Sequence, residues 1–255
     1  MPMLSFDNLT AGYPGKPVLE RISFRLVPHT ITAVLGKNGS GKSTLVSCIN
    51  QELRYTGEIC FAEQNIALLS PRERAKLLAI LPQNLERPRV PVEELVGFGR
   101  SPYLDIGKRF SQADRQAVEQ AMRDAGIEEL RGKNMRMLSG GEQQRAYLAM
   151  ILAQNTRVVI LDEPTTHLDM EYEAAFLRKL RELKTRHKKT VMLILHNLSQ
   201  AVQYADRIVI LQDGGIFFDG ATAKCLEEEA IERAFHVRRY EVLEGEEKRV
   251  FFLAQ

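Results

Sequence analysis

The sequence lacks an excess of either charge. Its 255 residues include 35 Lys and Arg against 33 Asp and Glu, so the formal net charge is only +2. Such a balance gives no support for binding a polyanion through bulk electrostatics. We therefore do not expect nucleic acid as a partner.

Cysteine is scarce, and long apolar runs are missing. The three cysteines, Cys48, Cys60 and Cys225, are far apart and lack the paired spacing of a disulfide framework or a zinc site. A reducing cytoplasm suits this pattern. No apolar stretch approaches the roughly 20 residues of a membrane-spanning helix, and residues 1–7 do not resemble a signal peptide. We expect a chain that is soluble on its own.

Internal repeats and low-complexity segments are also missing, and apolar runs alternate with helical patterns instead. Predicted strands cover residues 22–27, 31–35, 158–161, 191–195 and 208–211, and helical stretches such as 171–186 separate the later ones. Continuous apolar strands alternating with helices indicate an α/β fold with a mainly parallel, buried sheet.

Helix signals mark a second region. Ser70-Pro71 predicts a helix start, with the helix running through Ile80, and Ser111 predicts another helix that ends at Gly126. We interpret residues 84–136 as a mainly helical insertion in a single domain of residues 1–255. Asp213-Gly214-Gly215 predicts a hairpin turn. In the tail, residues 221–255, a second hairpin is predicted that pairs residues 239–243 with residues 249–253.

A glycine-rich loop follows the strand at 31–35 and precedes a helix. Gly36, Gly41, Lys42 and Ser43 match G-x-x-x-x-G-K-[ST]. Small residues let backbone N–H groups converge on phosphate, a lysine meets the outer phosphates, and a hydroxyl ligates Mg²⁺. The alternative, a chance glycine-rich turn, is disfavoured by this context. The predicted nucleotide-binding residues are Gly36, Lys37, Asn38, Gly39, Ser40, Gly41, Lys42, Ser43 and Thr44.

The strand at 158–161 ends in two carboxylates, Asp162 and Glu163. Buried carboxylates are costly unless they face a cation or water. We expect Asp162 to hold Mg²⁺ through water and Glu163 to act as general base on the attacking water. An ordinary solvated strand end is the alternative.

Ser139-Gly140-Gly141 precedes an apolar helix, where a hydroxyl, free N–H groups and the positive dipole end form an anion site. A simple serine N-cap is the alternative. The run Leu138-Ser139-Gly140-Gly141-Glu142-Gln143-Gln144-Arg145 resembles the signature of the ABC ATPase family.

The resemblance covers nearly the whole chain, because further motifs follow in the family's order. Tyr13 matches the aromatic residue that stacks on adenine. Gln83 matches the glutamine that touches Mg²⁺ and the attacking water, and His196 matches the histidine that senses the γ-phosphate. The segment from Pro164 to Asp169 matches the family's contact with the partner subunit.

The resemblance implies an ABC ATPase fold with N-terminal antiparallel strands and an inserted helical subdomain. It implies ATP and Mg²⁺ as cofactors, with Lys42, Gln83, Glu163 and His196 as catalytic residues and with Ser43, Gln83 and Asp162 at the metal. It also implies a head-to-tail dimer with a second copy, in which each ATP lies between the glycine loop of one chain and Ser139–Gly141 of the other.

Two positions depart from the family pattern. Asn197 follows the histidine where Asp is common, and His29-Thr30 occupies a turn that commonly contains glycine. We expect a modest effect from the uncharged amide and only local strain at the turn.

The stretch Val92–Tyr103 resembles the ATPases of importers for iron-siderophore, haem and cobalamin complexes. The family docks its membrane permease there, so we expect an interface that involves Leu95 and Tyr103. The resemblance implies a peripheral protein on the cytoplasmic face of a bacterial membrane, which meets a substrate-binding protein only indirectly. Ferric siderophore import is favoured over import of haem or cobalamin.

Two other functions remain open. A soluble ABC ATPase of cofactor assembly, translation or DNA repair usually carries two ATPase domains or a long coiled-coil insertion, and neither is visible. A P-loop kinase would share residues 36–43 but would have no use for Ser139–Gly141 or His196.

Overall fold

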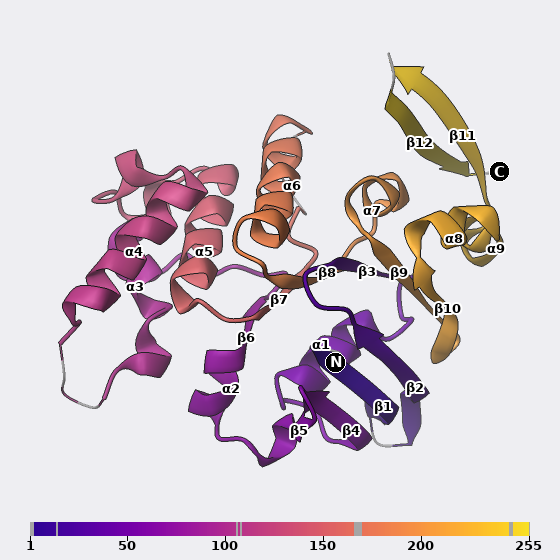
Figure 1. Cartoon of the computed structure of the whole chain (residues 1–255), viewed down its shortest axis with the longest axis horizontal. Coiled ribbons are helices and arrows are strands. Elements are labelled where there is room, and N and C mark those ends of the chain that lie inside the picture. Colours follow the sequence, from indigo (N-terminus) through magenta and orange to yellow (C-terminus); the bar gives the residue numbers. More distant parts are fainter. Residues whose placement is uncertain are drawn as a thin grey trace. The chain divides into compact units, whose positions relative to one another are not determined.

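The computed structural model describes residues 3–13, 15–105, 107, 109–165, 170–244 and 247–254. The chain divides into two compact units, which are best described separately (Figure 1). The first unit contains Met1–Leu68 and Thr190–Gln255, and the second contains Leu69–Lys189.

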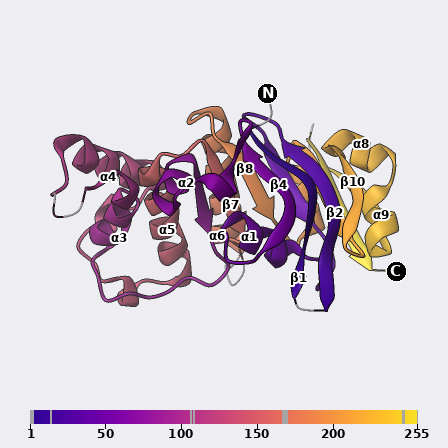
Figure 2. The ribbon, with the colours of Figure 1, turned by 90° about the horizontal axis from the view of Figure 1, so that it is seen from below.

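An antiparallel sheet opens the first unit. Its strands are β1 (Leu4–Tyr13), β2 (Lys16–Leu26), β4 (Tyr55–Phe61) and β5 (Gln64–Asn65), in the order β2-β1-β4-β5 (Figure 1). Figure 2 shows β1, β2 and β4 from below. The rings of Phe6 and Phe24 stack across β1 and β2 with centroids 4.3 Å apart. The run predicted at 22–27 is thus the end of a longer strand, and the N-terminal antiparallel strands implied by the family resemblance are present.

Parallel strands form the core of the same unit. Strand β3 (Ile31–Leu35) pairs in parallel with β8 (Thr190–Ile194) and with β9 (Arg207–Gln212). Every residue of β3 and β8 is buried, as their continuous apolar sequences predict. A turn at Asp213 and Gly214, both with positive φ, returns the chain antiparallel into β10 (Gly215–Ala221), which confirms the predicted hairpin.

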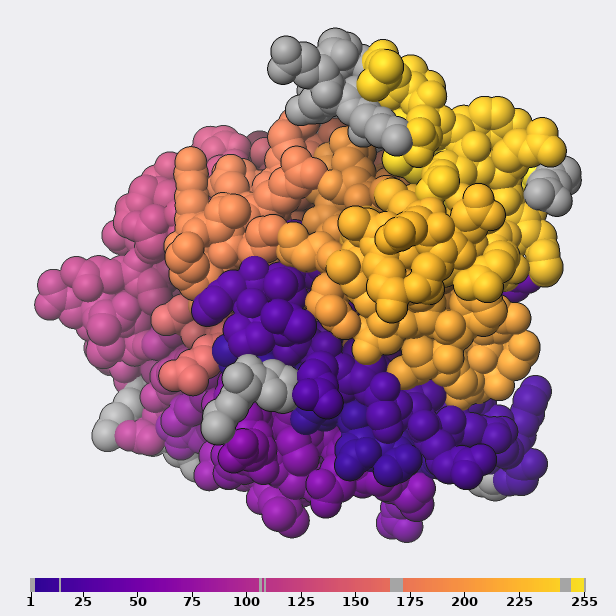
Figure 3. Space-filling view, turned by 45° about the vertical axis from the view of Figure 1, so that its right-hand side comes forward, coloured from indigo at the N-terminus to yellow at the C-terminus, as the bar shows by residue number. Residues whose placement is uncertain are grey.

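The remaining elements of the first unit follow the strands. They are α1 (Lys42–Ile49), the short turn Ile66–Leu68, α7 (Leu198–Tyr204), α8 (Thr222–Glu227), α9 (Ala230–Phe235), β11 (Val237–Glu244) and β12 (Glu247–Ala254). Strands β11 and β12 pair antiparallel, with Tyr240 opposite Phe251, so the tail hairpin is confirmed. Figure 3 shows these C-terminal residues, in yellow, on the molecular surface.

The second unit combines two parallel strands with helices. The strands are β6 (Leu78–Leu81) and β7 (Val158–Asp162). The helices are α2 (Pro71–Leu77), α3 (Val92–Phe98), α4 (Gln112–Ala125), α5 (Gly140–Gln154) and α6 (Met170–Thr185), with short 3₁₀ turns at Ser101–Tyr103, Glu128–Leu130 and Met135–Met137. Helices α3, α4 and α5 pack on one another (Figures 1 and 2).

Helix ends in this unit follow the predicted signals, with one exception. Ser70 and Ser111 are N-caps in complete capping boxes, and Gly126 ends α4 with φ of 66°. The helix after Ser70 does not run through Ile80, which corrects the prediction. It ends at Leu77, because Leu78–Leu81 pair with Val158–Leu161 as a strand.

Within the described residues, none of the helices combines the length and apolar character that crossing a bilayer requires.

The Ser111 cap provides a test of the fold. Its hydroxyl accepts from Asp114 N at 3.1 Å and donates to Asp114 Oδ2 at 2.6 Å. We expect Ser111→Ala to lower the free energy of unfolding by about 1 kcal/mol at neutral pH, measured by urea denaturation. The control Gln112→Ala changes an exposed residue of the same helical turn and should have little effect.

The same variant should show a pH dependence. The Ser111 hydroxyl is the largest cause that lowers the pKa of Asp114 below its ordinary value of 3.8. A carboxylate with a lowered folded pKa stabilises the fold above its unfolded pKa, and this stabilisation is lost as pH falls through the folded value. The difference between wild type and Ser111→Ala should therefore shrink below about pH 3.8. A difference that stays constant with pH would contradict this account.

Candidate functional site

The glycine loop joins buried strand β3 to helix α1. Gly39 and Gly41 have φ of 82° and 100°, in the region that favours glycine. A Cβ on Gly36 would overlap the Ser40 hydroxyl and lie 2.7 Å from the Leu211 carbonyl oxygen. Strand β9 therefore packs so closely behind the loop that only glycine fits at position 36.

Helix α1 begins without a side-chain cap. Its N-cap, Gly41, offers no side-chain cap, and no acidic residue lies in the first turn. The first N–H groups of a helix have no intrahelical partner and carry the positive end of the helix dipole. Ser43 is exposed in this turn, whereas Thr44 is buried. This arrangement favours an anion such as phosphate.

Lys42 is held inside the loop. Its side chain is buried, and its Nζ donates to Gly36 O at 2.7 Å and to Lys37 O at 3.2 Å. A backbone hydrogen bond from Ser40 N to Lys37 O, 3.1 Å long, forms a turn within the same loop. The ammonium group is thus positioned by the loop itself, as a phosphate-binding lysine requires.

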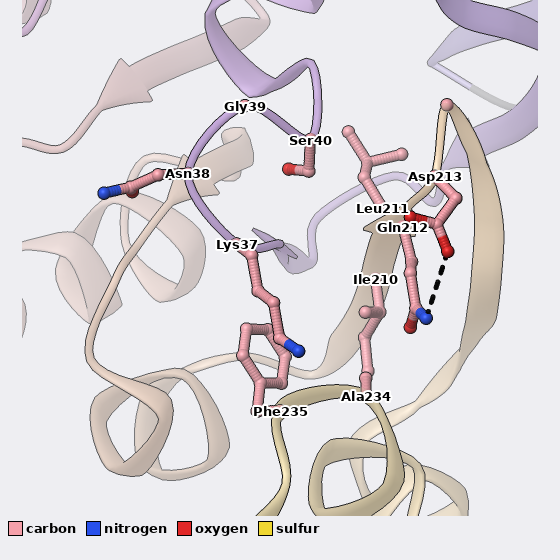
Figure 4. A pocket seen from close by; sticks show the side chains of 11 residues that line it. Lys37, Asn38, Gly39, Ser40, Ile210, Leu211, Gln212, Asp213, Ala234 and Phe235 are labelled. Atoms are coloured by element: carbon pink, nitrogen blue, oxygen red, sulfur yellow. Dashed lines mark hydrogen bonds between the residues drawn. The ribbon is translucent and has the colours of Figure 1, made fainter.

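A cavity of about 230 Å³ lies beside the loop (Figure 4). Residues Lys37, Asn38, Gly39 and Ser40 form one wall, and residues 210–214 with Ala234 and Phe235 form the other walls. The buried hydroxyl of Ser40 has no hydrogen-bond partner among the described residues. Because Lys42, Ser43 and Thr44 do not line this cavity, it borders the outer part of the loop rather than the start of α1.

Tyr13 lies at the end of β1 and is 61% exposed. It lines a surface pocket together with residues 10–12, 15–17 and 54–56. An exposed ring beside a pocket can stack on a flat aromatic ligand such as a purine base. A core-packing role is not consistent with this exposure.

The two carboxylates lie at the end of β7 in the second unit. Asp162 is 7% and Glu163 9% exposed. Glu163 has φ of 48°, so the chain turns sharply as it leaves the sheet. Gln83, which follows β6, donates from Nε2 to Glu163 Oε2 at 2.6 Å. The structure therefore brings together two of the predicted site residues that lie 80 positions apart in the sequence.

Ser139 is the N-cap of helix α5. Its hydroxyl accepts from Glu142 N at 3.3 Å, and its own N–H donates to Glu142 Oε2 at 2.8 Å. The bond from the Ser139 backbone is the largest cause that lowers the pKa of Glu142. The serine N-cap predicted as the simple alternative is therefore real, and it coexists with the exposed Gly140 at the positive end of the helix dipole.

Two neighbouring residues fix this helix start. A Cβ on Gly141 would lie 2.7 Å from the Tyr172 ring, so glycine is required there. Gln144 donates from Nε2 to the carbonyl oxygen of Pro164, the residue after Glu163. Gln144 is not among the predicted site residues. The one sequence feature that pointed to it is its position inside the signature run.

His196 and the two unusual positions lie in the first unit. His196 is exposed, two residues after β8. Asn197 is the N-cap of α7, and its side chain accepts from Gln200 N at 3.2 Å. Asn and Asp are equally good caps, which explains why the amide is tolerated. His29 adopts φ of 58°, a left-handed conformation that glycine would adopt more easily.

The structure describes the predicted permease segment and only part of the predicted partner-contact segment. Residues Thr166–Asp169 of the partner-contact segment lie outside the described residues. In the Val92–Tyr103 stretch, Leu95 is 2% exposed and belongs to the core of the unit. Tyr103 is half-buried and donates to Gln154 O at 3.0 Å. Phe98, 46% exposed, is the large apolar side chain that this stretch presents to the surface.

The predicted metal ligands carry oxygen donors suited to Mg²⁺: the Ser43 hydroxyl, the Asp162 carboxylate and the Gln83 amide. Because the amide nitrogen of Gln83 is bonded to Glu163, its carbonyl oxygen is the atom that a metal or water would use. The donor chemistry therefore fits a magnesium ion.

Comparisons with known proteins identify the family. Residues 19–166 match the family model described as "ABC transporter". The chain is 36% identical to the achromobactin transport ATP-binding protein CbrD of Dickeya dadantii (strain 3937), covering 93% of this chain and 89% of the relative. It is 36% identical to the ferric enterobactin transport ATP-binding protein FepC of Escherichia coli (strain K12), covering 91% and 86%.

A solved structure is similar over the whole chain. It is an inward-facing conformation of an ABC transporter of the metal-chelate type, with a TM-score of 0.86 and 26% identity. The similarity covers 99% of this chain and 97% of that chain.

The glycine loop provides a matched pair of variants. Gly39 and Gly41 both have positive φ, but a Cβ on Gly39 would meet nothing within 4 Å, whereas one on Gly41 would overlap the buried Leu19 side chain. We expect Gly39→Ala to cost about 1–2 kcal/mol of unfolding free energy through backbone strain, and Gly41→Ala to cost more. Only Gly41→Ala should weaken binding of a fluorescent ATP analogue at least tenfold. Equal losses in both variants would contradict this interpretation.

Proposed function

The chain belongs to the ABC transporter family, and on that premise we propose that it is the ATP-hydrolysing subunit of an importer for an iron-siderophore complex. The observation that carries the ATPase assignment is the contact between Gln83 and the buried Glu163, at 2.6 Å. A carboxylate fixed in this way suits a general base that accepts a proton from water.

The cargo assignment rests on the relatives. CbrD and FepC are named for transport of achromobactin and ferric enterobactin, and the similar solved structure is of the metal-chelate type. These relatives are covered over 86% or more of their length, so the similarity is not limited to one motif. Haem or cobalamin is the alternative cargo.

In this proposal the predicted residues have separate roles in nucleotide binding and in base catalysis. The first unit binds the nucleotide: Tyr13 stacks on the base, and the loop N–H groups with Lys42 hold the phosphates. His196 contacts the γ-phosphate. The second unit supplies Glu163 as base and Gln83 as the residue that orients the base and the attacking water.

Magnesium would be held by Ser43, Gln83 and Asp162. The ion would neutralise charge that develops on the phosphate oxygens. The protein's own contribution is to keep the Asp162 carboxylate buried at the end of β7, so that its charge is little screened by water.

We propose a head-to-tail dimer as the working form. The exposed Ser139 and Gly140 at the start of α5 would contact the phosphates of ATP bound to the loop of a second chain. ATP then stabilises the closed dimer by binding both chains, and hydrolysis removes this stabilisation.

We propose that membrane permease subunits dock on the second unit at the Val92–Tyr103 stretch. Phe98 offers an exposed apolar contact there, while Leu95 supports the helix from within. The chain would thus lie on the cytoplasmic face of a bacterial membrane and would meet the substrate-binding protein only through the permease.

Two variants separate nucleotide binding from completion of the site in the dimer. We expect Lys42→Ala to weaken ATP binding at least tenfold, because a charged phosphate contact is lost. Ser139→Arg should leave ATP binding by the monomer unchanged and should abolish the ATP-dependent dimer. Calorimetry measures the first effect and analytical ultracentrifugation the second. A Ser139→Arg chain that still dimerises with ATP would contradict the dimer model.

The cargo is tested by uptake in cells. Glu163→Gln keeps the size of the side chain but removes the base, so we expect uptake of one ferric siderophore in a panel to fall at least a hundredfold. Haem and cobalamin uptake serve as comparisons in the same cells. If uptake of every iron complex is unchanged, the siderophore assignment is wrong. Absence of any co-purifying polytopic membrane protein would instead favour a soluble ABC ATPase.

A further inference from the structure

The loop Gly99–Tyr103 lies against the C-terminal turn of α5, the helix that has Ser139 as its N-cap. A Cβ on Gly99 would overlap the carbonyl oxygen of Met150, so only glycine permits this approach. The loop comes directly after Phe98, the exposed residue of α3. The end of α5 is therefore in contact with the stretch that we propose docks the permease.

Two side chains donate to the last carbonyl groups of α5, and a third donates just beyond the helix. Arg100 Nη1 donates to Ala153 O at 2.8 Å, and the Tyr103 hydroxyl donates to Gln154 O at 3.0 Å. Just beyond the helix, Lys189 Nζ donates to Thr156 O at 2.6 Å. Two of these donors are cations, which suit the negative end of the helix dipole. The carbonyl groups of Ala153 and Gln154 are thus held by side chains of the Gly99–Tyr103 loop.

Arg100 is itself fixed in place. Its Nε lies 3.0 Å from Asp114 Oδ1, and both side chains are about nine-tenths buried, with 12% and 10% exposed. Its guanidinium lies over the Tyr103 ring, 4.0 Å from the centroid. Asp114 is held in turn by Ser111. A planar guanidinium makes all of these contacts at once, and a lysine ammonium cannot reproduce them.

The N-terminal end of α5 carries residues of the proposed nucleotide site. Ser139 caps that end, and Gln144 donates to Pro164 O, next to Glu163. The helix has 15 residues and is therefore about 22 Å long. If it tilts by about 5° around its fixed end, its start moves by about 2 Å. A misplacement of about 1 Å at a reacting group can cost a hundredfold in rate.

We infer that Arg100 and Tyr103 are positioning residues for ATP hydrolysis, which hold α5 in the orientation that places Ser139 and the backbone after Glu163. This inference rests on the proposed function for the nature of the reaction. It also gives a route by which a permease that contacts Phe98 acts on the nucleotide site. Movement of the loop at Gly99 is transmitted to α5 because the loop and the helix end are bonded together.

The first test is hydrogen–deuterium exchange of the isolated chain, which requires no activity. We expect Arg100→Lys to raise the exchange rates of the hydrogen-bonded amides 142–146 at least about threefold, at the helix end remote from the substitution. Tyr103→Phe, which removes one hydroxyl, should do so more weakly. Arg115→Lys is the control, because the side chain of this exposed arginine bonds only to Phe110 O among the described contacts. Faster exchange confined to residues 150–156 would overturn the inference.

The second test measures ATP hydrolysis per folded molecule. We expect Arg100→Lys to lower kcat at least tenfold, with the monomer's Kd for ATP within about twofold of wild type. A role in stability alone would lower the folded fraction and leave kcat per folded molecule equal to that of Arg115→Lys. Such equality would overturn the inference. A wild-type chain that hydrolyses no ATP would instead count against the proposed function, and the exchange measurement would still decide the positioning role.

Discussion

A carboxylate buried at the end of a buried strand is the constraint on which the rest of the structure depends. Glu163 leaves β7 in a left-handed conformation and is 9% exposed, next to the equally buried Asp162. Such groups destabilise a fold unless polar partners surround them. The amide of Gln83 supplies one partner, and Gln144 fixes the backbone at Pro164. The second unit therefore holds two buried carboxylates side by side in the sequence, an arrangement that is typical of functional sites.

Local signals in the sequence predicted much of the fold. The continuous apolar runs of β3, β7, β8 and β9 predicted buried parallel strands, since both faces of such strands are covered. Side-chain caps predicted helix starts at Ser70 and Ser111. The end of α2 was predicted wrongly, because Leu78–Leu81 suit a helix or a strand equally well and only pairing with β7 decides between them.

The sequence predicts a set of site residues but not the contacts between them. The end of the apolar strand identified Glu163 and the family resemblance identified Gln83, whereas their hydrogen bond depends on β6 and β7 being neighbours in the sheet. The roles of Gln144 and Arg100 depend on helix packing within the second unit, and no local pattern carries that information. Leu95 shows the same limit, since its burial follows from packing of α3 rather than from its neighbours in sequence.

In our proposal, the start of α5 in one chain completes the nucleotide site of another chain. The most direct measurement mixes Asn38→Cys chains with Ser139→Cys chains, both carrying Glu163→Gln and Cys60→Ser, and treats them with a short bifunctional maleimide. Cys48 and Cys225 should not interfere, because burial raises the pKa of these thiols to about 11 and about 12. The account predicts cross-linked pairs of unlike chains with ATP and few without nucleotide. Cross-linking that does not depend on ATP, or none at all, would contradict it.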